Sequence, residues 1–361
     1  MEFTAEDINK TFSKAKKDIG KVNILLVGKT GVGKSTLINA FFGEDLAETG
    51  IGRPVTQNFR EYTKEDSFVH LFDTKGIEIK DYKPILQELK GLINSRKTEN
   101  EADHIHLAWF CIQSESKRVE DAEINLLNEL AEQIPVVAVL TQCLSQKVAD
   151  QLKTSILEGA PFVKQVVKVL AEDYESDLGV HKAFGLDVLE EVSEQLVPEA
   201  FRKAFIAAQK VSLEAKKRQA HYIVGSGSAS AAAACAVPIP LSDAVALAPI
   251  QVGMLAGISV VFELKNSRNF LLSLVAIAGS VGGATYVGRA LFANVMKCIP
   301  GAGSAVGATV SATTAALVTT AMGEAYISAL VFMITAGIDL SPDNIGRYFK
   351  KALRKEKLEL A

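Results

Sequence analysis

Hydrophobic and polar positions follow two different patterns along this chain. From residue 20 to residue 198, short apolar runs typical of strands alternate with stretches of helical periodicity. Strands that alternate with helices predict an α/β domain, with a mostly parallel sheet and helices on both faces. The strand-like runs are 22–27, 58–62, 67–72, 105–112, 135–140 and 166–171, and the helical patterns cover 36–42, 82–94, 118–133 and 185–196.

After residue 198 the chain loses this alternation. Residues 199–220 form a charged amphipathic pattern that predicts a helix connecting two domains. Residues 221–345 contain long apolar runs with hardly any charge, and they predict an all-α domain rich in Gly and Ala. The runs are 223–262, 270–293 and 299–338, whose charged residues are Asp243, Arg289 and Glu324, respectively.

Small residues fill these apolar runs and leave two explanations open. Closely spaced Gly, Ala, Ser and Thr let helices approach each other, either in a membrane or in a tight soluble bundle. Because these residues contribute little to insertion, we expect peripheral or hairpin-inserted membrane association more than full spans, with the bundle as the alternative. The amphipathic helix at 1–19 and the basic tail at 346–361 would suit an anionic membrane surface, or would pack as ordinary terminal helices.

A glycine-rich loop separates the first predicted strand from the helical pattern after it. The loop fits G-x-x-x-x-G-K-[ST], and a strand before it with a helix after it is the context in which that pattern binds phosphate. Glycines let the backbone wrap an anion, so that N–H groups and the positive end of the helix dipole face it. We expect Lys34 to reach the β- and γ-phosphates and Ser35 to hold Mg²⁺. The residues expected to bind nucleotide are Gly28, Lys29, Thr30, Gly31, Val32, Gly33, Lys34, Ser35 and Thr36.

Two later segments carry residues suited to sensing a γ-phosphate. Residues 43–55 lack periodicity and stand where nucleotide switches keep a moving segment, and Thr56 after them could meet Mg²⁺ and the γ-phosphate or be a surface threonine. The next strand runs into Asp73-Thr74-Lys75-Gly76, where the aspartate could bind a Mg²⁺ water and the glycine N–H the γ-phosphate. We expect Lys34, Thr56 and Gly76 to serve catalysis, Asp73 to bind nucleotide, and Ser35, Thr56 and Asp73 to hold the metal.

These residues resemble the Era-like and septin-like branch of the translation-factor-related GTPases. The resemblance covers about residues 20–197 and rests on 28–35, Thr56 and 73–76. It implies a P-loop NTPase G domain, with a six-stranded, mostly parallel sheet that has one antiparallel strand, and a cycle between GTP and GDP. Ile77 stands where Ras-like members carry a water-orienting glutamine, which implies slow turnover.

The second half of the chain carries a further resemblance. Residues 237–251 are similar to the segment that marks the YcjF-type helical domain, which follows G domains in bacterial GTPases. The likeness spans roughly residues 215–340. It implies a domain architecture and leaves the biochemical role of the helical domain open.

The segment that would read the base departs from the pattern of these GTPases. They carry [NT]-K-x-D after a strand, and the aspartate accepts hydrogen bonds from the guanine edge. This chain has Thr141, then Gln142 in place of the lysine and Leu144 in place of the aspartate. The last predicted strand ends at Ala171, where a loop lining the base is expected. We expect Thr141, Gln142 and Ala171 to contact the nucleotide, and guanine selectivity stays open.

Composition narrows the setting further. The formal net charge of -3 gives no whole-molecule reason to expect a nucleic-acid partner. An acidic N-terminus without an apolar core is not a secretory signal, so we expect a cytoplasmic protein. We favour packing roles for His104 and His106, because no second acid or base lies near them in sequence. The cysteines are far apart without C-x-x-C spacing, which favours reduced thiols over a zinc site; they are Cys111, Cys143, Cys235 and Cys298.

Together, these features predict a nucleotide-dependent switch. The leading hypothesis is a slow GTPase that uses GTP, GDP and Mg²⁺ and controls an apolar helical domain, with association at a membrane surface and homodimerisation through the nucleotide face as further expectations. Two alternatives stay open, a scaffold that binds nucleotide with little turnover and an ATPase that shares the phosphate loop.

Overall fold

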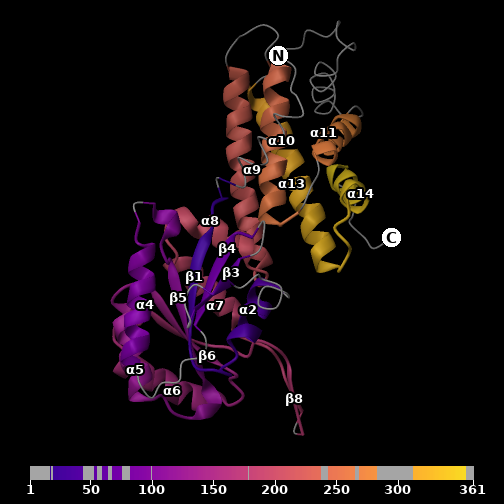
Figure 1. Cartoon of the computed structure of the whole chain (residues 1–361). Helices are drawn as coiled ribbons and strands as arrows, with labels where there is room; N and C mark the ends of the chain where they lie inside the picture. The colour runs from indigo at the N-terminus through magenta and orange to yellow at the C-terminus, as the bar shows by residue number, and fades with distance from the viewer. Residues whose placement is uncertain are drawn as a thin grey trace, which may run out of the picture. The chain divides into compact units, whose positions relative to one another are not determined.

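A computed structural model of the chain describes residues 17, 19–43, 53–54, 59–63, 67–74, 82–98, 100–177, 179–236, 243–264, 268–282 and 312–354 (Figure 1). The chain divides into two units, Ile19–Ser212 and a second unit that begins at Leu213. The helix predicted at 1–19 lies outside the described residues, apart from residue 17 and Ile19, which is buried.

The first unit is built on a seven-stranded sheet with the order β2-β3-β4-β1-β5-β6-β7. Strands β4, β1, β5, β6 and β7 run parallel, and β3 is antiparallel to β4. The predicted α/β fold is therefore confirmed, but the expected six strands are joined by β2, a two-residue strand beside β3. The strands are β1 Val22–Val27, β2 Arg53–Pro54, β3 Phe59–Thr63, β4 Val69–Thr74, β5 Leu107–Gln113, β6 Val136–Thr141 and β7 Gln165–Lys168.

Helices cover both faces of this sheet (Figure 1). On one face, Leu25, Phe110 and Ala138 pack in a single core with residues of α4, α5 and α6. Helices α2, α7 and α8 lie on the other face. Strands β1 and β6 are buried at every residue, as expected for parallel strands covered on both sides. The helices are α2 Lys34–Phe42, α4 Tyr82–Arg96, α5 Asp121–Ala131, α6 Gln146–Gly159, α7 Leu186–Leu196 and α8 Glu199–Ala208, with short 3₁₀ turns η2 Glu101–Asp103 and η3 Ser114–Ser116.

An aromatic cluster fills the layer between the sheet and α2. The ring of Trp109 on β5 is fully buried, and its centroid lies 4.7 Å from that of Phe41 and 5.7 Å from that of Phe42, both on α2. Phe41 also contacts Phe205 of α8, with 5.8 Å between centroids. Trp109 Nε1 donates a hydrogen bond to Ser193 Oγ of α7 at 3.0 Å. The cluster therefore holds the helix after the glycine-rich loop against the sheet.

His104 and His106 have packing roles, as favoured from the sequence. Nδ1 of the buried His106 accepts a hydrogen bond from the backbone N–H of Asn23 at 2.9 Å, and its Nε2 lies 3.0 Å from the carbonyl oxygen of Glu101. The ring stacks on Phe201 at 3.8 Å. Burial lowers the pKa of His106, and a proton on Nδ1 would displace the Asn23 bond. His104 bonds a backbone carbonyl at 2.8 Å.

The prediction of a single connecting helix over 199–220 is wrong. The chain forms α8, breaks, and starts α9 at Leu213. At the break, the side chain of Gln209 accepts from Ser212 N at 2.7 Å and donates to the Ser212 carbonyl at 2.9 Å. Lys210 N donates to the carbonyl of Phe41 at 2.8 Å. These bonds replace the helical ones, so α8 ends the first unit and α9 begins the second.

The second unit consists, in its described part, of helices packed through glycine. Helix α9 packs against α13 and α10. A Cβ atom on Gly323 would lie 2.5 Å from a methyl group of Val224, and one on Gly227 would lie 3.2 Å from Met254. Glycine therefore sets the close approach of these helices. The helices are α9 Leu213–Ala236, α10 Asp243–Val261, α11 Arg268–Gly282, α13 Ala312–Thr335 and α14 Pro342–Leu353.

Polar contacts also tie these helices together. Ser228 Oγ of α9 and Thr320 Oγ1 of α13 lie 2.8 Å apart, and Lys216 Nζ pairs with Glu263 at 2.9 Å. The described apolar helices thus pack on one another, which favours the bundle explanation for them. Within the described residues, one segment, Ala315–Thr335, is long and apolar enough to cross a membrane, but over half of it is buried, as in an ordinary core helix.

The basic tail predicted from residue 346 is part of a longer helix. Helix α14 begins at Pro342, since proline suits the first turn of a helix, and it packs on α13 and α11. The ring centroids of Tyr348 and Phe332 are 5.2 Å apart, and those of Phe349 and Tyr326 are 6.0 Å apart. The predicted boundary at 345/346 therefore falls inside a packed helix.

Candidate nucleotide-binding site

The glycine-rich loop leaves the carboxyl end of β1, which lies between β4 and β5 in the sheet. The carboxyl ends of parallel strands are where open α/β sheets bind ligands. A Cβ atom on Gly28 would lie 2.5 Å from the carbonyl oxygen of Cys111 on β5, so only glycine fits there. Gly31 and Gly33 have φ angles of +77° and +89°, which favour glycine. These three glycines fix the course of the loop.

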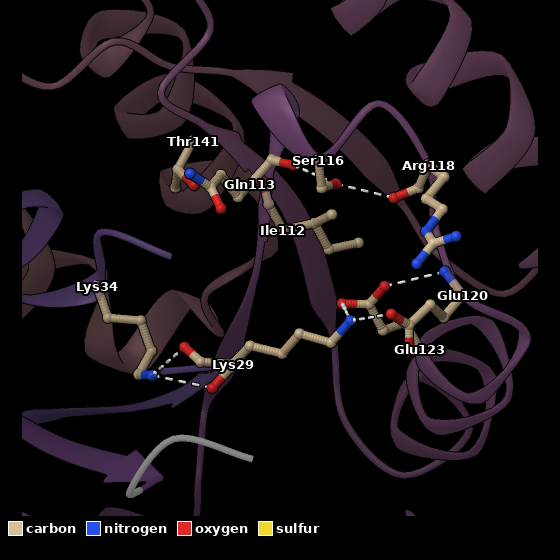
Figure 2. A network of polar contacts seen from close by, with 10 residues as sticks. Lys29, Lys34, Ile112, Gln113, Ser116, Arg118, Glu120, Glu123 and Thr141 are labelled. Atoms are coloured by element: carbon tan, nitrogen blue, oxygen red, sulfur yellow. Dashed lines mark hydrogen bonds and ion pairs between the residues drawn. The ribbon is translucent and has the colours of Figure 1, made fainter. Parts of the chain in front are cut away.

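Lys34, the first residue of α2, places a buried cation at this loop. Its side chain is 8% exposed, and Nζ donates to the carbonyl oxygens of Gly28 at 2.9 Å and Lys29 at 3.1 Å (Figure 2). A buried ammonium group at a helix N-terminus gathers positive charge in one place. The loop therefore has the electrostatics of an anion site.

Asp73 brings a carboxylate to the same place. It lies near the end of β4, opposite Leu26 of β1, and its Oδ1 lies 4.0 Å from Lys34 Nζ. That Oδ1 is buried and accepts no hydrogen bond from the residues that the structure describes. Burial raises the pKa of Asp73 to about 6, against the lowering effect of Lys34 and then Arg60. An unbonded carboxylate oxygen beside this lysine could accept a hydrogen bond from the water shell of a Mg²⁺ ion. The exposed hydroxyl of Ser35 on α2 would be a ligand of the same ion.

Thr141 and Gln142, at the end of β6, lie against the loop. Thr141 Oγ1 is 2.6 Å from the carbonyl oxygen of Val32, to which it donates. Gln142 has φ +51°, and its Oε1 accepts from Gln113 Nε2 at 2.7 Å. A Cβ on Gly33 would be 3.4 Å from Gln142 Nε2. A non-glycine residue in this strained conformation is a common mark of a functional loop.

Lys29 is held to α5 by a contact that the sequence did not indicate (Figure 2). Its Nζ lies 2.8 Å from Glu120 and 3.3 Å from Glu123, whose side chain is 4% exposed. The other oxygen of Glu123 accepts from the backbone N–H of Glu120 at 2.9 Å, as part of a capping box at the start of α5. A sequence signal existed in the E-x-x-E spacing before α5, but it predicts only the cap. This Lys29–acid cluster pins the outer side of the loop.

The other predicted site residues divide into three groups. Thr56 and Gly76 lie outside the described residues. Thr30 is exposed, Thr36 is half-buried in the first turn of α2, and Val32 is buried. Ala171 is half-buried, and the segment just before it lies beside the end of β6, because Cys143 N donates to the Val169 carbonyl at 3.2 Å. After Ala171, the two-stranded hairpin β8 Tyr174–Ser176 and β9 Gly179–His181 is exposed to solvent.

The fold and this loop define a phosphate-loop nucleotide-binding domain of the α/β class. Residues 23–142 match the family model of the 50S ribosome-binding GTPases. The match and the fold of residues 23–142 support a P-loop GTPase G domain in this part of the chain, and proteins with such domains bind GTP or GDP, usually with Mg²⁺.

Individual relatives are more distant. Mouse Septin-9 is 22% identical over 218 residues, which is 53% of this chain, and the chain spans 35% of the length of Septin-9. The G domain of the T. maritima FeoB iron transporter shares 17% identity over 49% of this chain and 98% of its own, with a TM-score of 0.33. A dimerisation-deficient mutant of Toc33 from Arabidopsis thaliana shares 16% identity over 55% of this chain and 91% of its own, with a TM-score of 0.33. At these scores the structural likeness adds nothing to the family match.

Proposed function

We propose that this chain is a GTP-dependent switch, a slow GTPase of the Era-like or septin-like kind whose nucleotide state controls its helical unit. The observation that carries the proposal is the buried Lys34 at the loop, with an unbonded oxygen of Asp73 4.0 Å away. Lys34 and the loop amides would stabilise phosphate charge, and Ser35 and Thr56 would hold a bound Mg²⁺. Asp73 would support that ion through water, and Gly76 would meet the γ-phosphate.

The proposed slow hydrolysis rests on Ile77, and the proposed control by nucleotide concerns the helical unit. The side chain of Ile77 cannot hydrogen-bond and so cannot orient an attacking water, which leaves turnover to depend on a partner or on dimerisation through the nucleotide face. The helical unit, which we assign to the YcjF type, is the element that the nucleotide state controls. We place the protein in the cytoplasm, associated with a membrane surface.

Two alternatives keep specific support. Leu144 offers no carboxylate to the guanine edge, which favours an ATPase that shares the loop. Ile77 equally fits a scaffold that binds nucleotide with little turnover.

Titration with fluorescent GTP, GDP and ATP analogues in Mg²⁺, together with a phosphate-release assay, tests the proposal. We expect Lys34-dependent binding of guanine nucleotides and slow release of phosphate, both lost in Lys34→Ala. Lys90→Ala is the matched control, because Lys90 pairs with Glu129 at 2.6 Å between α4 and α5. A preference for ATP would establish the ATPase, binding without turnover would establish the scaffold, and binding that survives Lys34→Ala would refute all three.

A further inference from the structure

Helix α14 presents two chemically different sides. Ile345, Tyr348 and Phe349 are buried, and the two aromatic rings contact Phe332 and Tyr326 of α13. The apolar side is therefore already covered within the helical unit. What α14 offers to a partner is its polar side.

That polar side carries a basic stripe, which we define as Arg347, Lys350, Lys351 and Arg354. The spacing i, i+3, i+4, i+7 places the four residues on one side of a helix, within roughly 100° of arc. Arg347, Lys350 and Arg354 are exposed, and Lys351 is half-buried. Asp343 is the single acid in 342–354, so this segment has four cations and one anion, a net charge of +3.

The basic stripe is held in place at its centre. The guanidinium carbon of Arg347 lies 5.0 Å from the ring centroid of Tyr348, and Lys351 Nζ lies 5.4 Å from it. Arg347 also donates to the Asn344 side chain at 3.0 Å. Since the Tyr348 ring is itself 1% exposed and packs on α13, its contacts hold the charged groups of Arg347 and Lys351 in place.

We propose that the basic stripe docks on the headgroups of an anionic phospholipid surface. Lysine and arginine near such a surface each add to the affinity within a Debye length, and the stripe is complementary to it in charge. Because the apolar side of α14 is buried, the helix lies on the headgroups and does not insert into the acyl chains. This proposal rests on the membrane association proposed above and identifies the basic stripe as the surface that makes the contact.

Vesicle co-flotation of the full chain tests this proposal. The vesicles contain phosphatidylcholine alone or with phosphatidylserine, at about 0.1 M and about 0.5 M salt. We expect binding to the phosphatidylserine vesicles at low salt, weakening at high salt, and little binding to phosphatidylcholine. Arg347→Gln/Lys350→Gln removes two charges and should weaken binding roughly 30-fold. Lys153→Gln/Lys164→Gln, which removes two charges on and after α6, should leave it unchanged.

Several results would overturn the proposal. Equal binding to both kinds of vesicle would mean apolar insertion, and equal binding by the two double variants would mean that the basic stripe is not the contact. Failure to bind vesicles together with binding of a short DNA duplex or a polyglutamate peptide would assign the stripe to another polyanion. The same assay on Lys34→Ala separates the two proposals, because lipid binding through α14 should persist when nucleotide binding is lost.

Discussion

The contact between Lys29 and the start of α5 allows a direct test of how the phosphate loop is held. Lys29→Gln removes the cation, and Glu123→Gln removes the buried anion while keeping its shape. If the Lys29–acid cluster positions the loop, both changes should weaken nucleotide binding. The reason is that the peptide of Lys29 carries the carbonyl oxygen bonded to Lys34 at 3.1 Å.

The size of the effect follows from the exposure of each partner. Lys29 and Glu120 are 30% and 43% exposed, a range in which an ion pair contributes about 0.2–1 kcal/mol. Glu123 is 4% exposed, and a hydrogen bond to a charged group contributes about 1.5–3 kcal/mol. If about 1–2 kcal/mol of this total acts on the loop, nucleotide affinity should fall roughly 5- to 30-fold.

The measurement is the dissociation constant and dissociation rate of a fluorescent GDP, taken well below the melting temperature of each variant. Lys29→Arg keeps the charge and should restore most of the affinity. Lys90→Gln breaks an ion pair of similar exposure elsewhere on α5 and should have no effect.

Two outcomes would refute the reasoning. If Lys29→Gln weakens binding while Glu123→Gln strengthens it, Lys29 contacts the nucleotide itself and the acids compete for it. If neither changes the dissociation rate, the loop is held by its glycines and Lys34 without help from α5.

Three further predictions concern packing, protonation and base selection. Gly323→Ala should destabilise the helical unit by about 1–3 kcal/mol, because the new methyl group meets Val224. Gly225→Ala, which has open space around it, should instead stabilise the unit by about 0.5–1 kcal/mol. Thermal unfolding followed by circular dichroism measures both changes, and equal shifts would mean that the glycine contact is unimportant. The pKa of His106 is lowered in the folded chain, so the unfolded chain takes up the proton first and stability is lost as the pH falls through 6.5. The urea midpoint should therefore change more between about pH 7.5 and about pH 5.5 in the wild type than in His106→Gln. An equal change in the two proteins would contradict this. Leu144 cannot accept a hydrogen bond from the exocyclic amino group of guanine, so ITP, which lacks that group, should bind within about threefold of GTP. Leu144→Asp should create a preference for GTP. If competition titrations show that the wild type strongly prefers GTP over ITP, another residue reads the base.

Local sequence signals were sufficient for most of the first unit. Strand β1 was predicted at the residues where it occurs, because an apolar run between a charged residue and a glycine has few other solutions. The break between α8 and α9 was not predictable in this way, since the segment 209–212 contains neither Gly nor Pro. It depends on the bond from Lys210 N to Phe41, a residue of a distant helix.

The site divides along the same line. The course of the loop could be read from the spacing of Gly28, Gly33 and Lys34, because these residues lie close together in sequence. The contact of Lys29 with α5 could not, because it depends on how the sheet brings the start of α5 to the loop that follows β1. The position of Gln142 over the loop also required the structure, since its conformation is one that a glutamine seldom adopts.

The burial of Trp109 has an optical consequence. It is the single tryptophan of the chain, and it lies in an apolar setting between the sheet and the helix that follows the phosphate loop. Its emission in the native protein should be at short wavelength and should shift to the red only when this layer opens. The helical unit that begins at Leu213 contains tyrosine but no tryptophan, so fluorescence excited selectively at tryptophan follows the nucleotide-binding unit by itself. A difference between fluorescence and circular dichroism during unfolding would thus report directly whether the two units melt as one.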